Sequence, residues 1–399
     1  MVQLAAPAGR RWLVLGLGLA AQTASCAFLY GLPFLAPAMR AAEGLSLATV
    51  GAVVAAPSAG LLLTLVAWGA LTDRYGERVV MAAGLGASGL LLAFAAAGSH
   101  PVGLLAGMFL LAGASTAAVN AASGRVVLGW FGAAERGLAM GVRQTAQPLG
   151  VGLAALTLPA LAAEWGFRAA LLLPAGLAVL VSVLVAALVT DPPRPEPGAG
   201  AARPVSPYRE ATLWRLHGAS ALLVVPQFAV SAFAPVYLVA VRDWSPLAAG
   251  WFLAVVQGLG AVGRLVAGYW SDRAGSRLRP MRLLAVASAA VMLLLALGDA
   301  GLPWLVPLAL ALAAVITVSD NGLGFTASAE LAGASWAGRA MGAQNTAQNL
   351  AAALTPPLLG LVIGESRYAL AFALAAVFPV LAVRLVPVRS EHPAQRVAQ

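Results

Sequence analysis

Four ionisable side chains lie inside long apolar stretches of this sequence: Arg125, Arg143, Arg264 and Asp320. A charge in an apolar stretch is costly and is usually paired or turned toward a polar cavity, so each is a candidate functional residue. The arginines could attract an anion, and Asp320 could carry a proton or pair with an arginine. Plainer explanations stay open, because an arginine can extend to the aqueous surface and Asp320 can belong to a fixed structural pair.

Side-chain amides gather at similar depths in several of these stretches. Gln144 and Gln147 are three residues apart, as are Asn345 and Gln348, so each pair can share one face of a helix. Amides at this depth can hydrogen-bond a small polar molecule, and they can equally hold helices together. The full set is Asn120, Gln144, Gln147, Asn321, Gln344, Asn345, Gln348 and Asn349, with Gln22 and Gln227 as possible additions.

Two polar segments show that the chain is an internal repeat. Gly69–Arg78 (GALTDRYGER) recurs as Gly268–Arg277 (GYWSDRAGSR), with the shared residues 199 positions apart. Ala139–Gln147 (AMGVRQTAQ) recurs 201 positions later as Ala340–Gln348 (AMGAQNTAQ). The sequence therefore consists of two similar halves.

The composition excludes a soluble domain, with 61% apolar and only 10% charged residues. Apolar runs of membrane-spanning length recur along the chain. On a rise of 1.5 Å per residue, the three arginines lie about 7–9 Å from a span end and Asp320 about 15 Å from one. We predict twelve spans, at residues 12–38, 46–71, 79–98, 102–129, 138–163, 167–190, 213–241, 247–270, 280–299, 303–330, 338–363 and 367–387.

A segment rich in Pro, Gly and Ala divides the chain near its middle. We predict an N-terminal six-helix bundle at 1–190, a cytoplasmic linker at 191–211 and a C-terminal six-helix bundle at 212–399. All 24 basic residues are arginines. Most of them fall in the termini and in loops on the same side, so both termini are expected to be cytoplasmic. The opposite loops hold only Arg40, Arg168, Arg242 and Arg367.

The repeated polar segments join two spans through a very short turn. Gly76 and Gly275 are expected where this turn needs unusual backbone angles. Asp73 is expected at the cytoplasmic edge, where it can accept hydrogen bonds from a helix N-terminus or an arginine. The arginines of these segments could instead serve only to fix the topology.

The segment Gly69–Arg78 resembles the signature loop of the major facilitator superfamily, G-x-x-x-D-(R/K)-x-G-x-(R/K), and its copy falls at the equivalent loop of the second half. The resemblance covers essentially the whole chain. It implies an all-α membrane protein of twelve transmembrane helices in two pseudo-symmetric bundles, working by alternating access. It also implies an inward gate formed by Gly69, Asp73, Arg74, Gly76, Arg78, Asp272, Arg273 and Gly275.

Within this family, Trp130–Thr145 is similar to the corresponding junction of uptake branches that handle organic anions, cyanate-like and nitrate-like solutes. The run Ala146–Gly152 is a poor match to the G-x-x-x-G-P-x-x-G-G pattern of the efflux branch. The sequence therefore favours proton-coupled uptake of a small organic anion, with proton-coupled drug or metabolite efflux as the alternative. Asp320 would couple protons, and the solute would meet Asn120, Arg125, Arg143, Gln144, Gln147, Asn321 and Gln348.

Other functions are not expected from this sequence. It has no nucleotide-binding loop, and His100, His217 and His392 do not have the spacing of metal ligands, so neither an enzyme nor a cofactor is predicted. A non-transporting membrane sensor would require the gate residues to be dispensable. The expected partners are a small solute, protons and the lipid bilayer of a bacterial inner membrane. Nucleic acid and an obligate oligomer are not expected.

Overall fold

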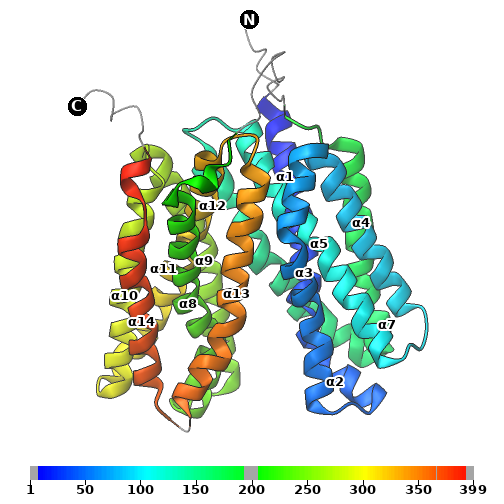
Figure 1. The fold of residues 1–399 in the computed structure, drawn as a ribbon. Coiled ribbons are helices and arrows are strands. Elements are labelled where there is room, and N and C mark those ends of the chain that lie inside the picture. Colours follow the sequence, from blue (N-terminus) through cyan, green and yellow to red (C-terminus); the bar gives the residue numbers. More distant parts are fainter. Residues whose placement is uncertain (1–7, 193–204, 365, 392–399) are drawn as a thin grey trace, which may run out of the picture. The chain divides into compact units, whose positions relative to one another are not determined.

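The computed structural model describes residues 8–192, 205–364 and 366–391, and these fold into helices without any strand (Figure 1). Most of the predicted linker, residues 193–204, therefore lies outside the described residues. The helices of the first half are α1 (Ala8–Leu29), α2 (Leu32–Glu43), α3 (Leu47–Tyr75), α4 (Glu77–Ala96), α5 (Val102–Trp130), α6 (Arg136–Gln144) and α7 (Ala146–Leu188). Those of the second half are α8 (Ala211–Ala240), α9 (Pro246–Ala274), α10 (Leu278–Ala300), α11 (Val306–Ser319), α12 (Asn321–Ala332), α13 (Ala337–Ile363) and α14 (Tyr368–Leu385), with short 3-10 turns η1 (Pro207–Arg209), η2 (Pro303–Leu305) and η3 (Val388–Ser390).

The prediction of twelve spans is confirmed. Eleven helical segments of the described residues are long and apolar enough to cross a membrane, and one of them, Arg136–Leu188, has 53 residues. Its length of roughly 80 Å is far more than a hydrocarbon core of about 30 Å needs. Gly166, with φ of 81° and ψ of 161°, interrupts α7 inside this segment and leaves two parts of membrane-spanning length. Only glycine adopts these angles readily, so one residue separates the fifth span from the sixth.

Some predicted spans are built from two helices rather than one. The first is divided between α1 and α2, the fifth between α6 and α7, and the tenth between α11 and α12. By contrast, α3 continues through Pro57, and α8 continues through Pro226 and Pro235. Neighbouring helices in a bundle can satisfy the carbonyl groups that a proline leaves unbonded.

The chain divides into two compact units. Unit 1 comprises Met1–Phe131, Thr145–Pro204 and Ala334–Gly342, and unit 2 comprises Gly132–Gln144, Val205–Gly333 and Ala343–Gln399. They follow the two halves of the sequence except that each contains one short segment of the other half. The segment Ala334–Gly342 contains the first turns of α13, and the segment Gly132–Gln144 contains all of α6. The helix α13 therefore begins in unit 1 and continues in unit 2.

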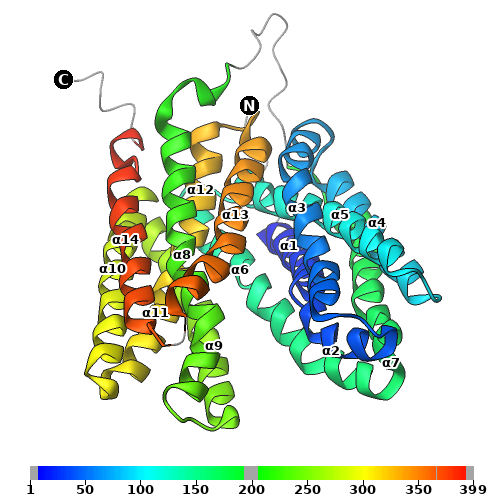
Figure 2. The ribbon, with the colours of Figure 1, turned by 60° about the horizontal axis from the view of Figure 1, so that its bottom comes forward.

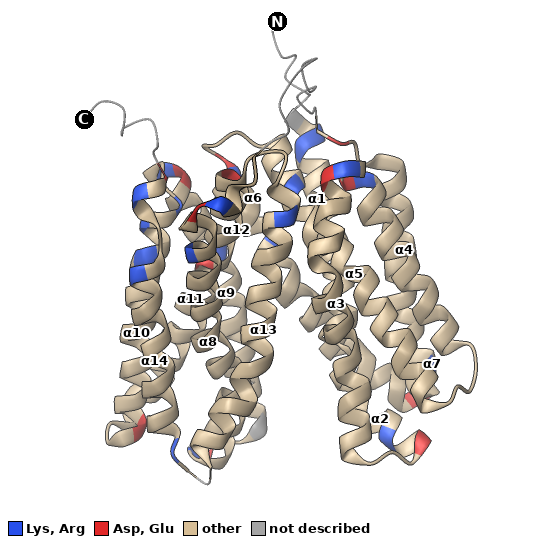
Figure 3. Ribbon diagram, viewed as in Figure 1, with Lys and Arg blue, Asp and Glu red and all other residues tan. Residues whose placement is uncertain are grey.

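Each unit is held together by close helix pairs. In unit 1, α3 packs along α5, where Gly60 and Gly113 each bring their backbone against the neighbouring helix and leave no room for a Cβ atom. In unit 2, α10 and α14 run side by side in both views (Figures 1 and 2). Small residues permit such close approach, and the resulting van der Waals packing helps to hold helices together in a membrane. In each unit the charged residues gather mostly near one end of the helices (Figure 3).

Candidate functional sites

The first signature loop places Asp73 against both kinds of partner expected from the sequence. Its carboxylate accepts hydrogen bonds from the backbone N–H groups of Gly338 (2.9 Å) and Arg339 (3.2 Å), in the first turn of α13. It also forms an ion pair with Arg125 of α5, and its side chain is only 4% exposed. The N–H groups of a first turn have no partner within their own helix, and the helix dipole favours a negative charge there.

Arg125 lies between two carboxylates of unit 1. One of its nitrogens contacts Asp73 and another, Nε, lies 2.7 Å from Oε1 of Glu77, whose side chain is fully buried. Glu77 follows Gly76 in the signature loop, and no role is predicted for it from the sequence. The structure therefore places Arg125 with Asp73 and Glu77, whereas Asn120, on the same helix, bonds Gln22.

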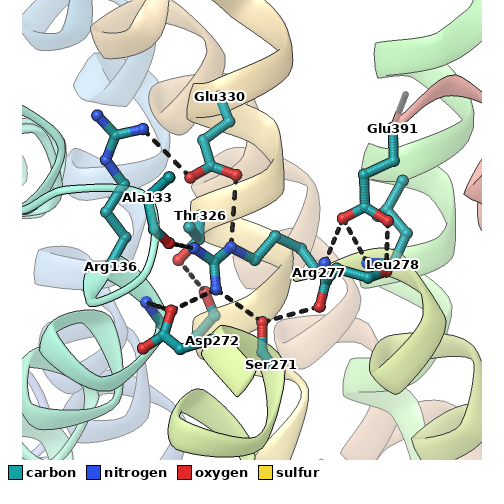
Figure 4. Close-up of polar contacts among 12 residues, drawn as sticks. Ala133, Arg136, Ser271, Asp272, Arg277, Leu278, Thr326, Glu330 and Glu391 are labelled. Carbon is teal, nitrogen blue, oxygen red and sulfur yellow. Dashed lines mark hydrogen bonds and ion pairs between the residues drawn. The ribbon is translucent and has the colours of Figure 1, made fainter. Parts of the chain in front are cut away.

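The second signature loop repeats this geometry with a different arginine (Figure 4). Asp272 accepts from the N–H groups of Gly137 and Leu138, both at 2.8 Å, in the first turn of α6. Its ion-pair partner is Arg277, with 2.5 Å between Nη1 and Oδ1. The repeat places Thr326 where the first half has Arg125. The partner therefore comes from the loop end rather than from the helix, and the sequence analysis missed it.

Arg277 is the centre of a larger polar cluster in unit 2. Besides Asp272 it donates to Oγ of Ser271 (2.9 Å) and to the backbone oxygen of Ala133. Glu330, near the end of α12, lies 3.4 Å from Nε of Arg277 and 3.3 Å from Nη1 of Arg136 (Figure 4). The cluster thus ties the segment before α6 to α9, α10 and α12.

Glycines let the signature loops approach these first turns. A Cβ atom on Gly69 would overlap the backbone of Gly338, and the reverse holds as well. Gly268 and Gly137, which are their repeat mates, stand in the same relation in unit 2. The turn glycines Gly76 and Gly275 have φ of 98° and 59°, so the predicted need for unusual backbone angles is confirmed.

The remaining predicted gate arginines lie outside these contacts. Arg74 stacks on Tyr75, with its guanidinium 5.2 Å from the ring centre, and Arg273 stacks on Tyr269 at 5.5 Å. Arg78 donates from Nε to the carbonyl oxygen of Ala186 (2.7 Å). All three arginines are exposed, while Arg125 and Arg277 form the ion pairs with Asp73 and Asp272.

Two charged residues are buried among the helices of unit 2. Asp320 occupies the break between α11 and α12 and is 2% exposed, and Arg264 of α9 is 4% exposed. Among the described residues, Oδ2 of Asp320 has no hydrogen-bond partner. Arg143, on α6, is 2% exposed and lies over the ring of Phe325, with 5.4 Å between guanidinium and ring centre.

The predicted amides form two separate clusters. In unit 2, Asn321 donates to Gln227 (3.0 Å) and accepts from Gln348 (3.4 Å). In unit 1, Gln22 donates to Asn120 (3.0 Å) and accepts from Ser123 (3.2 Å). The two asparagines are repeat mates, and each bonds a glutamine from the first helix of its half. Gln22 and Gln227 thus each contact one of the predicted amides, and their place in a polar ring around a solute stays a prediction.

The expectation that Gln144 and Gln147 share one helix is wrong. The helix α6 ends at Gln144 and α7 begins at Ala146, so the two amides belong to different helices and different units. Gln144 accepts from Arg143 (2.9 Å), and Gln147 is half-buried in α7. Pro148 marks the interruption, because it has no N–H to donate to the carbonyl of Gln144 four residues earlier.

A further buried cluster involves a histidine that the sequence did not assign to a site. Nε2 of His217 lies 3.0 Å from the hydroxyl of Tyr208, and Nδ1 lies 2.5 Å from Oε1 of Gln344. Burial raises the pKa of Tyr208 to about 12, so the phenol can donate to Nε2 at neutral pH. No group of three metal-ligating side chains exists in the described part of the chain, and His392 lies outside that part.

Comparison with known proteins places these features in one family. The model of the Major Facilitator Superfamily matches residues 18–356. A protein of Mycobacterium tuberculosis named uncharacterized MFS-type transporter is 46% identical over 389 residues, which are 96% of this chain and 86% of that protein.

Solved structures share the fold at low sequence identity. The human organic anion transporter MFSD10 has a TM-score of 0.77 at 18% identity, covering 96% of this chain and 100% of that chain. The fucose:proton symporter FucP of Escherichia coli has a TM-score of 0.73 at 14% identity, covering 95% and 99%.

Proposed function

Because this chain belongs to the major facilitator superfamily and is a multi-pass membrane transporter, we propose that it takes up a small organic anion together with protons by alternating access. The observation that carries the proposal is that unit 2 buries both an arginine, Arg264, and a carboxylate, Asp320, inside its helices. Such a pair combines a cation that attracts an anion with a carboxylate that can bind a proton.

The pair suggests how the two fluxes are coupled. A solute carboxylate and Asp320 carry the same charge and would compete for Arg264. Protonation removes the charge of Asp320, so that Arg264 then interacts with the solute instead. Release of the solute would return Arg264 to Asp320 and drive the proton off. The adjoining amides Asn321, Gln227 and Gln348 would supply neutral hydrogen-bonding groups for the rest of the solute.

The contacts of Arg125 favour a gate role over the anion-binding role expected from the sequence. Two buried carboxylates, Asp73 and Glu77, already surround its guanidinium. Arg143 and Arg264, both buried in unit 2, are better candidates to attract the solute. We therefore assign anion attraction to these two, and to Arg125 the task of holding Asp73.

The gate would consist of two matched contacts. Asp73 holds the first turn of α13, and Asp272 holds the first turn of α6. Each contact joins residues from opposite halves of the sequence. In our proposal, both first turns leave their carboxylates when the cytoplasmic side opens, and return to them when it closes.

The proposed class of solute occurs among proteins that share this fold. One structural relative is described as an organic anion transporter and another as a proton symporter, at identities that speak only for the fold. The clustering of arginines at the signature-loop end of each unit supports cytoplasmic termini in a bacterial inner membrane (Figure 3). The chain contains both copies of the repeat, which supports a monomer as the working transporter.

The proposal is tested with purified protein in proteoliposomes that contain a pH-sensitive dye. Small carboxylates are added one at a time, followed by lipophilic cations. Acidification of the lumen with a carboxylate supports anion–proton symport. A response only to cations, with exchange for protons, would contradict it and favour drug or metabolite efflux.

Variants then assign the roles of individual residues. Asp320→Asn should abolish proton movement, and Arg264→Gln should raise the KM for the active carboxylate by at least about tenfold, as the loss of one charge-assisted bond predicts. Arg282→Gln is the matched control, because this arginine is exposed and has no carboxylate partner among the described residues. An unchanged KM in Arg264→Gln would remove Arg264 from the site.

A further inference from the structure

The last described residue of the chain caps a helix next to the second gate. Oε1 of Glu391 accepts from the backbone N–H groups of Arg277 and Leu278 (3.1 Å for the latter), and Oε2 accepts from Oγ of Ser276 at 2.5 Å (Figure 4). These groups form the start of α10. Glu391 follows α14 and η3, so the end of the second half is fixed on the signature loop of the same half.

An equivalent contact exists in the first half. Asp191, which follows α7, accepts from the backbone N–H of Arg78 at 2.8 Å, at the start of α4. The neighbouring backbone is docked as well, because the carbonyl oxygen of Thr190 accepts from Nε1 of Trp130 at 3.2 Å. The segment that leaves the first bundle is therefore fixed on the first signature loop.

The two carboxylates occupy matching places in the repeat. Asp191 and Glu391 are 200 positions apart, and Arg78 and Arg277 are 199 apart. Both lie beyond the last helix of their half and outside the signature segments. Their side chains differ in length and their flanking sequences differ, yet both acids cap the helix that follows the signature loop. Capping of that helix is thus a shared feature of both units.

Each capped helix start is linked to a gate carboxylate by one ion pair in unit 2 and by two in unit 1. In unit 2, Glu391 holds the backbone of Arg277, whose side chain pairs with Asp272, and Asp272 holds the first turn of α6. In unit 1, Asp191 holds the backbone of Arg78. The preceding residue, Glu77, pairs with Arg125, which in turn pairs with Asp73.

We propose that Asp191 and Glu391 are matched positioning residues of the two gates. Each fixes the start of the helix that follows the signature loop. A charged side chain at that helix start in turn contacts the gate carboxylate, directly in unit 2 and through an arginine in unit 1. Asp191 and Glu391 then influence how readily the first turns of α13 and α6 are released from the gate carboxylates. This inference rests on the gate role assigned to Asp73 and Asp272 above.

Hydrogen–deuterium exchange of the full-length protein tests the proposal without any solute. The variant is Glu391→Gln, the conservative rescue is Glu391→Asp, and the control is Ser390→Ala in the same turn. A cap that acts only locally would raise exchange at residues 276–280 alone. A positioning role also raises exchange at 132–144, which contains the N–H groups bonded to Asp272 but none bonded to Glu391.

We expect about a five-fold faster exchange at 132–144 in Glu391→Gln, which corresponds to about 1 kcal/mol for a lost cap. Glu391→Asp should restore most of the protection, and Asp191→Asn should have the same effect at 334–342. Unchanged exchange at 132–144 in Glu391→Gln, while Asp272→Asn raises it, would overturn the inference alone. Unchanged exchange in Asp272→Asn would overturn the gate role and this inference with it. The solute panel tests anion transport separately.

Discussion

The ion pair between Asp73 and Arg125 should be strongly coupled in a double-mutant cycle. The variants are Asp73→Asn, Arg125→Gln and the double variant. Arg125→Gln removes the cation between two buried carboxylates, Asp73 and Glu77, whose side chains are 4% and 0% exposed. Asp73→Asn leaves Arg125 with Glu77 at 2.7 Å, so its guanidinium keeps one partner.

Magnitudes follow from which charges lose their partners. Breaking a buried pair by removing one partner costs about 3–5 kcal/mol, and we assign about 4 kcal/mol to Arg125→Gln. Asp73→Asn should cost about 2 kcal/mol, since one of two ion pairs of Arg125 remains and the amide still accepts a hydrogen bond. Once Arg125 is absent, the charge of Asp73 has less to stabilise it. The double variant should therefore differ from additivity by about 2 kcal/mol.

The unfolding free energy is measured by denaturant titration in detergent micelles. A thiol-reactive dye follows the exposure of Cys26, which is the only cysteine and is 3% exposed in the folded protein. Transport by each variant gives Vmax and KM, and a gate role predicts that Arg125→Gln lowers Vmax more than it raises KM. Additivity within about 0.5 kcal/mol, or a change confined to KM, would refute the gate role of Arg125.

Three further substitutions test the packing and the backbone. Gly338→Ala should abolish transport and destabilise the gate contact by about 1–3 kcal/mol, because its Cβ atom would lie 2.6 Å from Oδ1 of Asp73; reconstituted flux is the measurement. Gly166→Ala should lower the unfolding free energy by about 1–3 kcal/mol through backbone strain alone, since no atom lies within 4 Å of the added carbon. Gly152→Ala is the control for both glycine variants, because its added Cβ atom would meet no atom within 4 Å and its φ is not positive. Equal effects in Gly338→Ala, Gly166→Ala and Gly152→Ala would contradict the reasoning. Asp299→Asn should destabilise unit 2 by about 1–3 kcal/mol, measured by hydrogen–deuterium exchange of α8, α10 and α14, because its carboxylate accepts from Tyr237, Arg242 and the start of α14; unchanged exchange would show these bonds to be dispensable.

Local sequence patterns were enough to predict the fold. Apolar runs of membrane length give the spans, and the repeat of Gly69–Arg78 at Gly268–Arg277 gives two equivalent halves. Turn glycines are also local, and both Gly76 and Gly275 have the positive φ expected of them. These features depend on residues close together in the chain, so they can be predicted from composition, periodicity and spacing.

The partners of the charged residues could not be predicted in the same way. Asp73 contacts Gly338 across 265 positions, and Asp272 contacts Gly137 across 135. Of the arginines near Asp272, the neighbour Arg273 stacks on Tyr269, while Arg277 forms the ion pair. Helix rotation and the end of α9 decide between them, and neither is visible in a motif.

The sequence by itself determined a twelve-span repeat with charged residues confined to loops and a few buried positions. Only the tertiary structure decided that Arg125 pairs with Asp73, that segments 132–144 and 334–342 belong to the opposite units, and that Glu391 caps α10. The physical reason is the separation along the chain. A membrane span depends on apolar residues that are neighbours in the sequence. An ion pair or a helix cap requires groups far apart in the sequence to lie within about 3 Å of each other, and only the fold determines which groups meet.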